Sequence, residues 1–138
     1  MNKHAVSIDL HLQYRHMLGE LAPYFYGLER GEAVASRCPV CNKVWFPPRL
    51  VCARDRVETE WTELSGSGTV ISVTTGHGLL PLAAVGEQHT FALIALDGAD
   101  NAAFGRIVSR ALVGPGDRVR ITKNPQPARH PAQAAYYT

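Results

Sequence analysis

Three cysteines and an aspartate lie close together in this sequence, and their spacing constrains the fold more than any other feature. Cys38 and Cys41 are separated by two residues, and Cys52 and Asp55 repeat that spacing after an interval of ten residues. A two-residue gap lets both side chains of a turn face one ion, and two such turns complete a tetrahedron of ligands. We therefore predict a rubredoxin-like zinc ribbon in which these four residues hold a structural zinc ion.

The aspartate leaves two interpretations of this cluster open. A carboxylate oxygen binds zinc at about 2.0–2.2 Å, so three thiolates and one carboxylate form a feasible ligand set, although a weaker one than four thiolates. The alternative is a metal-free relic, but such relics usually lose several ligands together, and three thiolates remain here. A catalytic zinc would need an open coordination position, and a disulfide framework would need an even number of cysteines. We therefore favour a structural metal site.

The residues before the cluster predict a helical arm. Ser7 suits the cap of a first helix, and Gly19 and Pro23 divide the arm into two pieces. The apolar residues that suggest a helical period are Ile8, Leu12, Leu18, Leu21, Tyr24, Phe25 and Leu28. The arm carries more aromatic surface than it can bury against itself, so it must pack on this chain's own barrel or on a partner subunit.

From residue 33 onward the sequence changes to short β-rich runs separated by Gly, Pro, Asn and Asp. The predicted strands lie at 33–38, 60–75, 90–97, 102–109 and 117–124. Gly66 and Gly68 would let the longest strand bend, as the corner of a small barrel requires. The predicted fold class is mainly β. It comprises a helical arm at 1–32, a zinc ribbon at 33–58, a C-terminal OB-fold β-barrel at 59–124 and an extended tail at 125–138.

Charge and composition exclude several functions. The 14 basic and 12 acidic residues give a formal charge of +2, and the basic residues are scattered along the chain. This pattern argues against strong binding to nucleic acids of any sequence. We find no membrane-length apolar stretch and no signal peptide, so we expect a soluble, cytoplasmic protein. The sequence also lacks a GxSxG elbow, an HExxH motif and a convincing Cys/His nucleophile pair, so we predict no catalytic residues.

The order of the motifs resembles a known family. These motifs are YFYGL at 24–28, RCPVC at 37–41, WFPPR at 45–49, Cys52, SGSGTV at 65–70 and FGRIV at 104–108. Together they resemble the acyl-CoA-associated zinc-ribbon/OB-fold family catalogued as domain of unknown function 35 (DUF35). The resemblance covers about residues 20–123, which is most of the chain.

The resemblance implies an accessory subunit of a thiolase-like enzyme, a class that includes acyl-CoA thiolases, acetyl transferases and aldolases of side-chain degradation. The catalytic residues would then belong to the partner in a hetero-oligomer, and no catalytic residue carries over to this chain. Cys38, Cys41 and Cys52 match the family's ribbon, whereas Asp55 replaces its usual fourth cysteine. The substrate of the complex would be an acyl-CoA, cleaved by thiolysis of a 3-oxoacyl-CoA or by retro-aldol reaction of a hydroxyacyl-CoA.

A binding site for the CoA portion would need an apolar or aromatic shelf and fixed cations for its phosphates. Phe46 and the two following prolines could form the shelf beside Arg49, with Arg37 and Arg54 as further cations. The alternative is that Phe46 only packs the ribbon against the barrel and that Arg49 is solvated.

A second class of function is single-stranded nucleic-acid binding, because OB barrels do bind oligonucleotides. Such proteins need stacking aromatics on barrel strands with a basic groove beside them. The predicted barrel strands offer only Trp61, Phe91 and Phe104. The sequence therefore favours the accessory subunit.

Overall fold

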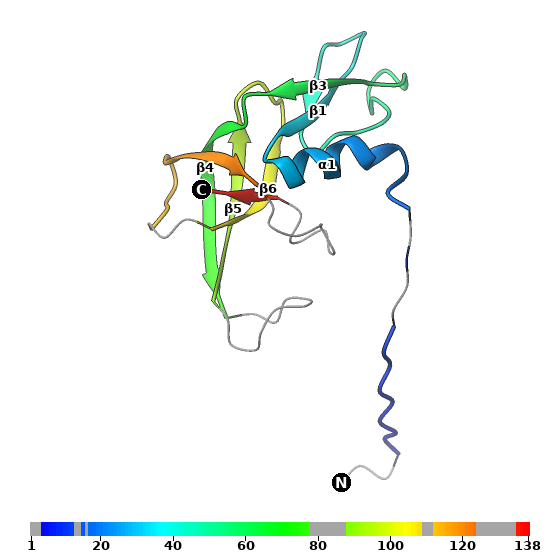
Figure 1. Ribbon diagram of the computed structural model, residues 1–138, viewed down its shortest axis with the longest axis vertical. Coiled ribbons are helices and arrows are strands. Elements are labelled where there is room, and N and C mark those ends of the chain that lie inside the picture. Colours follow the sequence, from blue (N-terminus) through cyan, green and yellow to red (C-terminus); the bar gives the residue numbers. More distant parts are fainter. Residues whose placement is uncertain (1–3, 13–14, 16, 78–87, 109–111, 124–134) are drawn as a thin grey trace.

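The computed structural model describes residues 4–12, 15, 17–77, 88–108, 112–123 and 135–138. It contains one short α-helix, a three-stranded sheet and a closed barrel, so the predicted mainly β fold class is confirmed (Figure 1). The elements are η1 (Gly19–Leu21), α1 (Ala22–Arg30), β1 (Ala33–Arg37), β2 (Val44–Trp45), β3 (Glu60–Leu64), β4 (Ser67–Gly76), β5 (His89–Leu96), β6 (Ala102–Ile107), β7 (Arg118–Thr122) and β8 (Tyr136–Tyr137). Neither helix of the described residues has the length and apolar character that crossing a bilayer demands.

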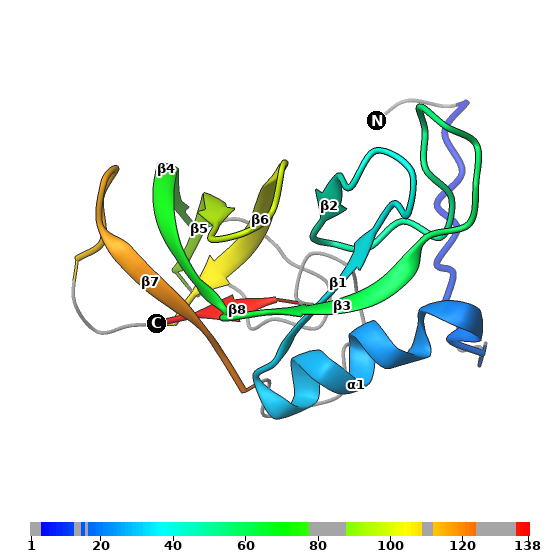
Figure 2. The ribbon, with the colours of Figure 1, turned by 90° about the horizontal axis from the view of Figure 1, so that it is seen from above.

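The three-stranded sheet carries the cysteine cluster, and α1 packs against it (Figure 2). The strand order is β2-β1-β3, and both pairings are antiparallel. A Cβ atom on Gly27 would lie 2.5 Å from Cγ2 of Val34, so only glycine lets the helix approach β1 this closely. Pro23 lies in the first turn of α1, and Gly31 ends the helix in the left-handed conformation with φ 76°.

The barrel closes in the order β4-β5-β6-β8-β7. Alternate residues of its strands point inward, as the two-residue period of a strand requires. On β5 these are Ala92, Ile94 and Leu96, which are all buried. On β7 they are Val119 and Ile121.

The ribbon and the barrel share one hydrophobic core. Phe46, which follows β2, is fully buried, and its ring meets that of Tyr24 edge-on at 5.6 Å. Its backbone N–H donates to Oδ1 of Asn101 at 3.0 Å, and the side-chain amide of Asn101 donates back to the Phe46 carbonyl at 3.0 Å. The Val44 N–H likewise donates to the carboxylate of Asp100, whose own N–H donates to the Val44 carbonyl. These paired bonds fix β2 of the ribbon against the loop between β5 and β6.

The prediction of a first helix in the arm is wrong. Residues 7–12 form neither helix nor strand, and the segment runs away from α1 and the barrel (Figure 1). Among the described residues, helical structure begins at Gly19, and α1 confirms the second piece of the predicted arm. A short helix without tertiary contacts is marginal in water, and the apolar residues of this segment alternate instead of forming one helical face. Tyr14 and His16 lie outside the described residues.

The predicted long strand and the predicted boundary between the ribbon (33–58) and the barrel (59–124) also differ from the structure. The long strand predicted at 60–75 is divided at Gly66, whose φ of 80° turns the chain out of the ribbon sheet and into the barrel. β3 therefore belongs to the ribbon and not to the barrel.

The end of the chain does not form the predicted tail over the described residues 135–138. Tyr137 in β8 is fully buried inside the barrel, between β6 and β7. Gly105 on β6 makes room for it, because a Cβ atom there would lie 2.2 Å from Cε2 of the Tyr137 ring. The preceding part of the predicted tail, 125–134, lies outside the described residues.

Candidate metal centre

Two turns of nearly identical geometry form the cysteine cluster. In the first, the Asn42 N–H donates to the Cys38 carbonyl at 3.0 Å, and in the second the Arg56 N–H donates to the Cys52 carbonyl at 2.9 Å. Asn42 and Arg56 both adopt the left-handed conformation, with φ values of 59° and 55°. Asparagine tolerates this conformation well, whereas arginine adopts it at a cost of about 1–2 kcal/mol. The second turn therefore keeps the backbone of the first despite its aspartate.

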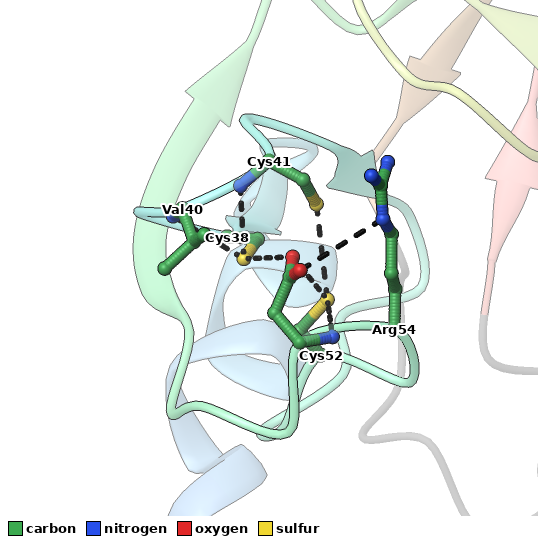
Figure 3. Close-up of polar contacts among 6 residues, drawn as sticks. Cys38, Val40, Cys41, Cys52 and Arg54 are labelled. Atoms are coloured by element: carbon green, nitrogen blue, oxygen red, sulfur yellow. Dashed lines mark hydrogen bonds and ion pairs between the residues drawn. The ribbon is translucent and has the colours of Figure 1, made fainter.

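Backbone N–H groups in both turns point at the sulfur atoms (Figure 3). The N–H groups of Val40 and Cys41 lie 3.4 Å and 3.5 Å from Sγ of Cys38. The N–H of Asp55 lies 3.4 Å from Sγ of Cys52. Hydrogen bonds of this kind favour the thiolate over the thiol, and the thiolate is the form that binds a metal.

The four side chains converge on one point. Their ligand atoms all lie within 4.8 Å of one another, with Cys38 and Cys52 buried and the other two half-buried. Sγ of Cys41 lies 3.8 Å from Sγ of Cys52. Oδ2 of Asp55 lies 3.3 Å from Sγ of Cys38 and 3.4 Å from Sγ of Cys52. The arrangement can therefore hold one metal ion with four protein ligands.

Hydrogen bonding couples the protonation of these ligands. The thiol of Cys41, followed by those of Cys38 and Cys52, lowers the pKa of the Asp55 carboxyl, and the nearby guanidinium of Arg54 lowers it further. In turn, hydrogen bonding to Asp55 raises the pKa of Cys41 to about 12. The ionised form of Asp55 and the protonated form of Cys41 therefore favour each other. Binding of a metal ion would release the proton of Cys41, because metal ligands bind in their deprotonated forms.

Trp45 packs beside the cysteine cluster and also contacts the guanidinium of Arg49. Its side chain packs with Cys38 and Cys52 in a small buried group. The guanidinium of Arg49 lies over the Trp45 ring, with Cζ 5.9 Å from the ring centroid, and the Arg49 N–H donates to Oγ of Ser36 at 2.8 Å. The cluster and Arg49 are thus joined through one indole ring.

The structure separates the residues of the predicted CoA shelf. Phe46 is fully buried, so its ring lies in the shared core and offers no face to a ligand. Trp45 ends β2 and Phe46 lies in the bend that follows, and the two rings pack in different buried clusters. Arg49 therefore lies beside the ring of Trp45 and not beside that of Phe46, and no motif in the sequence signals this difference.

The other two predicted cations are exposed and already paired. Arg37 lies 3.8 Å from Glu60, and Arg54 lies 3.8 Å from Asp55. No carboxylate of the described residues forms such a pair with Arg49. Of the three arginines, Arg49 is therefore the one whose charge is least compensated.

Comparison with known proteins supports the resemblance at the level of the fold. No family model matches the sequence. A crystal structure of a DUF35 protein of unknown function from Sulfolobus solfataricus shares 19% identity and aligns with a TM-score of 0.62 over 86% of this chain and 84% of that one. The Ltp2-ChsH2(DUF35) aldolase shares 19% identity and aligns with a TM-score of 0.68 over 90% of this chain and 97% of the matched chain. Both neighbours are DUF35 proteins, as the sequence motifs predict.

Proposed function

We propose that this chain is a non-catalytic accessory subunit of a thiolase-type enzyme complex that acts on acyl-CoA thioesters. The reaction of the complex is thiolysis of a 3-oxoacyl-CoA or a related cleavage or formation of a C–C bond, such as retro-aldol cleavage of a hydroxyacyl-CoA. The observation that carries the proposal is the extent of the fold match with the Ltp2-ChsH2(DUF35) aldolase, which includes 97% of the matched chain. Nearly all of that chain aligns with this one, which supports a role for this chain as a subunit of a similar complex.

An apolar surface on the barrel supports a protein partner. On the outside of β4, β5 and β6, Ile71, Leu93 and Phe104 are exposed, and the ring of Phe91 stacks on that of Phe104 at a centroid distance of 5.1 Å. Exposed apolar groups that gather on one face are typical of protein interfaces. We propose that the catalytic subunit binds to this face of the barrel.

We further propose that the metal is zinc and that its role is structural. Zinc binds thiolates at about 2.3 Å and carboxylates at about 2.0–2.2 Å, so a tetrahedral site has edges of roughly 3.8 Å between sulfurs and roughly 3.5 Å between sulfur and oxygen. The corresponding distances in the cluster are 3.8 Å between Cys41 and Cys52, and 3.3 Å and 3.4 Å from Asp55 to Cys38 and Cys52. Four protein ligands leave no open position for a substrate, so the ion would stabilise the ribbon.

Arg49 is the residue that we propose to contact the CoA portion of the substrate. Its guanidinium is exposed and lies over the Trp45 ring, an arrangement that holds the cation in place without neutralising it. Guanidinium groups bind phosphates through two parallel hydrogen bonds, which a pyrophosphate or a 3′-phosphate can accept. Arg37 and Arg54 would add to the local positive charge, each reduced by its own carboxylate partner.

The experiment that tests the proposed function is reconstitution. The tagged chain is co-expressed with untagged thiolase-type and aldolase-type subunits of the same organism, and the purified complex is assayed for cleavage of acyl-CoA substrates. We expect one such subunit to co-purify in a fixed ratio and to depend on this chain for stability or turnover. A matched pair of variants, Phe104→Asp on the proposed interface and Leu112→Asp at an exposed site on another segment, separates interface loss from general effects. Equal recovery of the partner with both variants would contradict the assigned surface.

The stacked Phe91–Phe104 pair is also the one observation that favours the second candidate, a single-stranded nucleic-acid binder. Fluorescence anisotropy with a labelled oligonucleotide distinguishes the two. A nucleic-acid binder would show saturable, strongly salt-dependent binding that Phe104→Ala abolishes. The accessory-subunit proposal predicts no such binding.

A further inference from the structure

The segment before α1 has the side-chain pattern of a β-strand but no strand partner. Val6, Ile8, Leu10 and Leu12 alternate with polar residues, and between 74% and 84% of each of these four side chains is exposed. Successive residues of a strand point to opposite faces, so these four would form one apolar face about 20 Å long. Residues 5–12 form no strand within the described chain, and they lie away from the barrel and the ribbon (Figure 1). We call residues 5–12 the arm strand.

The ribbon sheet has an open edge beside an apolar groove. β3 pairs with β1 on one side, and no described strand pairs with its other side. A groove of about 680 Å³ runs between this edge and α1, where Pro23 and Tyr26 face Trp61 and Glu63 of β3. Tyr26 and Trp61 remain 51% and 42% exposed there. A strand added to β3 would place one of its faces over this groove.

The groove continues past Pro23 and Trp61 into a second hollow of about 490 Å³. Two carboxylates, Glu20 and Glu58, line this part, and Glu63 lines the first part. The only cation lining either hollow among the described residues, Arg30, is ion-paired with Glu32 at 2.6 Å. We call the open edge of β3 and the groove beside it the acceptor surface. This surface is therefore apolar at its centre and acidic along its margin.

The arm strand and its flanks have the complementary character. In the sequence of residues 3–15 the charged residues are Lys3, Asp9 and Arg15, so this stretch has a formal charge of +1 with histidine neutral. When a peptide adds to the edge of a sheet as a new strand, main-chain hydrogen bonds provide the affinity. Pockets for alternate side chains provide the specificity. The groove and the arm strand are thus matched in apolar character and are opposite in the sign of their charge.

We propose that the arm strand of one copy of this chain adds to the open edge of β3 in a second copy, with its apolar face on the groove beside Tyr26 and Trp61. Each chain carries both the donor and the acceptor, so two copies can exchange arms around a two-fold axis and satisfy both at once. This inference concerns the chain's own assembly and does not depend on the identity of the catalytic subunit.

Sedimentation equilibrium of the full-length chain over a wide range of concentrations tests the proposal. We expect a reversible monomer–dimer equilibrium. The double variant Ile8→Asp/Leu10→Asp should weaken it by at least about tenfold, because it places two charges on the face that enters an apolar groove. Glu63→Lys, an exposed change on the acceptor, should weaken it as well. Leu112→Asp makes the same kind of substitution at a fully exposed residue outside both surfaces and should leave the equilibrium unchanged.

A labelled peptide of residues 4–15 identifies the occupant of the groove. It should bind the full-length Ile8→Asp/Leu10→Asp variant, whose own arm is disabled while its groove is intact. A peptide with the same composition but without the alternation should not bind. A wild-type chain that stays monomeric at every concentration would overturn the proposal, whether its arm occupies its own groove or only a surface of the catalytic subunit. A dimer that persists unchanged in the double variant would overturn it equally.

Discussion

Oδ2 of Asp55 lies 3.3 Å from Sγ of Cys38, although the two residues are 17 positions apart in the sequence. This contact places the carboxylate where it could serve with the three cysteines as the fourth ligand of a metal ion. Asp55→Ala should therefore lower zinc affinity by at least about tenfold, and Asp55→Cys should raise it, because a fourth thiolate suits zinc better than a carboxylate. Elemental analysis and competition with a chelator measure both effects. Full zinc occupancy and unchanged affinity in Asp55→Ala would show that the aspartate is not a ligand.

The absence of a side chain at Gly105 leaves room for the ring of Tyr137 in the last strand of the barrel. Gly105→Ala places a methyl group inside the Tyr137 ring, so β6 and β8 must separate, and the free energy of unfolding should fall by about 1–3 kcal/mol. Gly76→Ala is the matched control, because a Cβ atom there meets nothing within 4 Å. Chemical denaturation compares the two variants. Equal stabilities would mean that β8 does not pack on β6 as described.

Buried tyrosines predict a loss of stability at high pH. Burial raises the pKa of Tyr24 to about 12, and burial, with a smaller effect of Tyr24, raises the pKa of Tyr137 further. An unfolded tyrosine ionises near pH 10. The stabilising contribution of each buried phenol is therefore complete below about pH 10. It is lost as the pH rises through the pKa that this phenol has in the folded protein. Unfolding followed by tyrosinate absorbance should show this window.

Tyr137→Phe tests the same pair of residues at neutral and high pH. The Tyr137 hydroxyl is buried without a hydrogen-bond partner in the described structure, so its removal should leave stability at neutral pH unchanged or raise it by about 1 kcal/mol. The variant should also lose less stability above pH 10. Tyr26→Phe, at an exposed position, should change neither quantity. Marked destabilisation of Tyr137→Phe would reveal a bond that the structure does not show.

Arg49→Ala should raise the KM of the assembled enzyme for its CoA ester by about tenfold, and kcat should change little, because the contact is with a part of the substrate that does not react. Arg49→Lys should have an intermediate effect, since an ammonium keeps the charge but not the paired hydrogen bonds. Arg120→Ala removes an exposed guanidinium from β7 and serves as the control. An unchanged KM in Arg49→Ala would show that Arg49 does not contact the CoA portion of the substrate.

Much of the fold could be predicted because its signals are local. The repeated two-residue spacing of Cys38–Cys41 and Cys52–Asp55 predicted the ligand cluster, and the β-rich runs predicted β1 and β5–β7 to within about two residues. The bend predicted at Gly66 is confirmed by its φ of 80°. The sequence did not show that this bend separates two sheets, because that depends on which strands pair.

The errors concern features decided by distant contacts. Tyr136 and Tyr137 lie in a Pro- and Ala-rich stretch without a period, and only the space above Gly105 makes them a barrel strand. Phe46 and Arg49 are neighbours in the sequence, yet the shared core buries the first and leaves the second in solvent. The second piece of the predicted helical arm is confirmed as α1, whereas the first piece was predicted as a helix although residues 6–12 alternate between apolar and polar.

The most direct test of the central claim is turnover by the separated and the combined subunits. The partner-free chain, the catalytic subunit alone and their co-purified complex are each assayed with the same acyl-CoA substrate. The account predicts no turnover by this chain, and turnover by the complex that exceeds that of the catalytic subunit alone. Cleavage of the substrate by the purified, partner-free chain at the rate of the complex would contradict it.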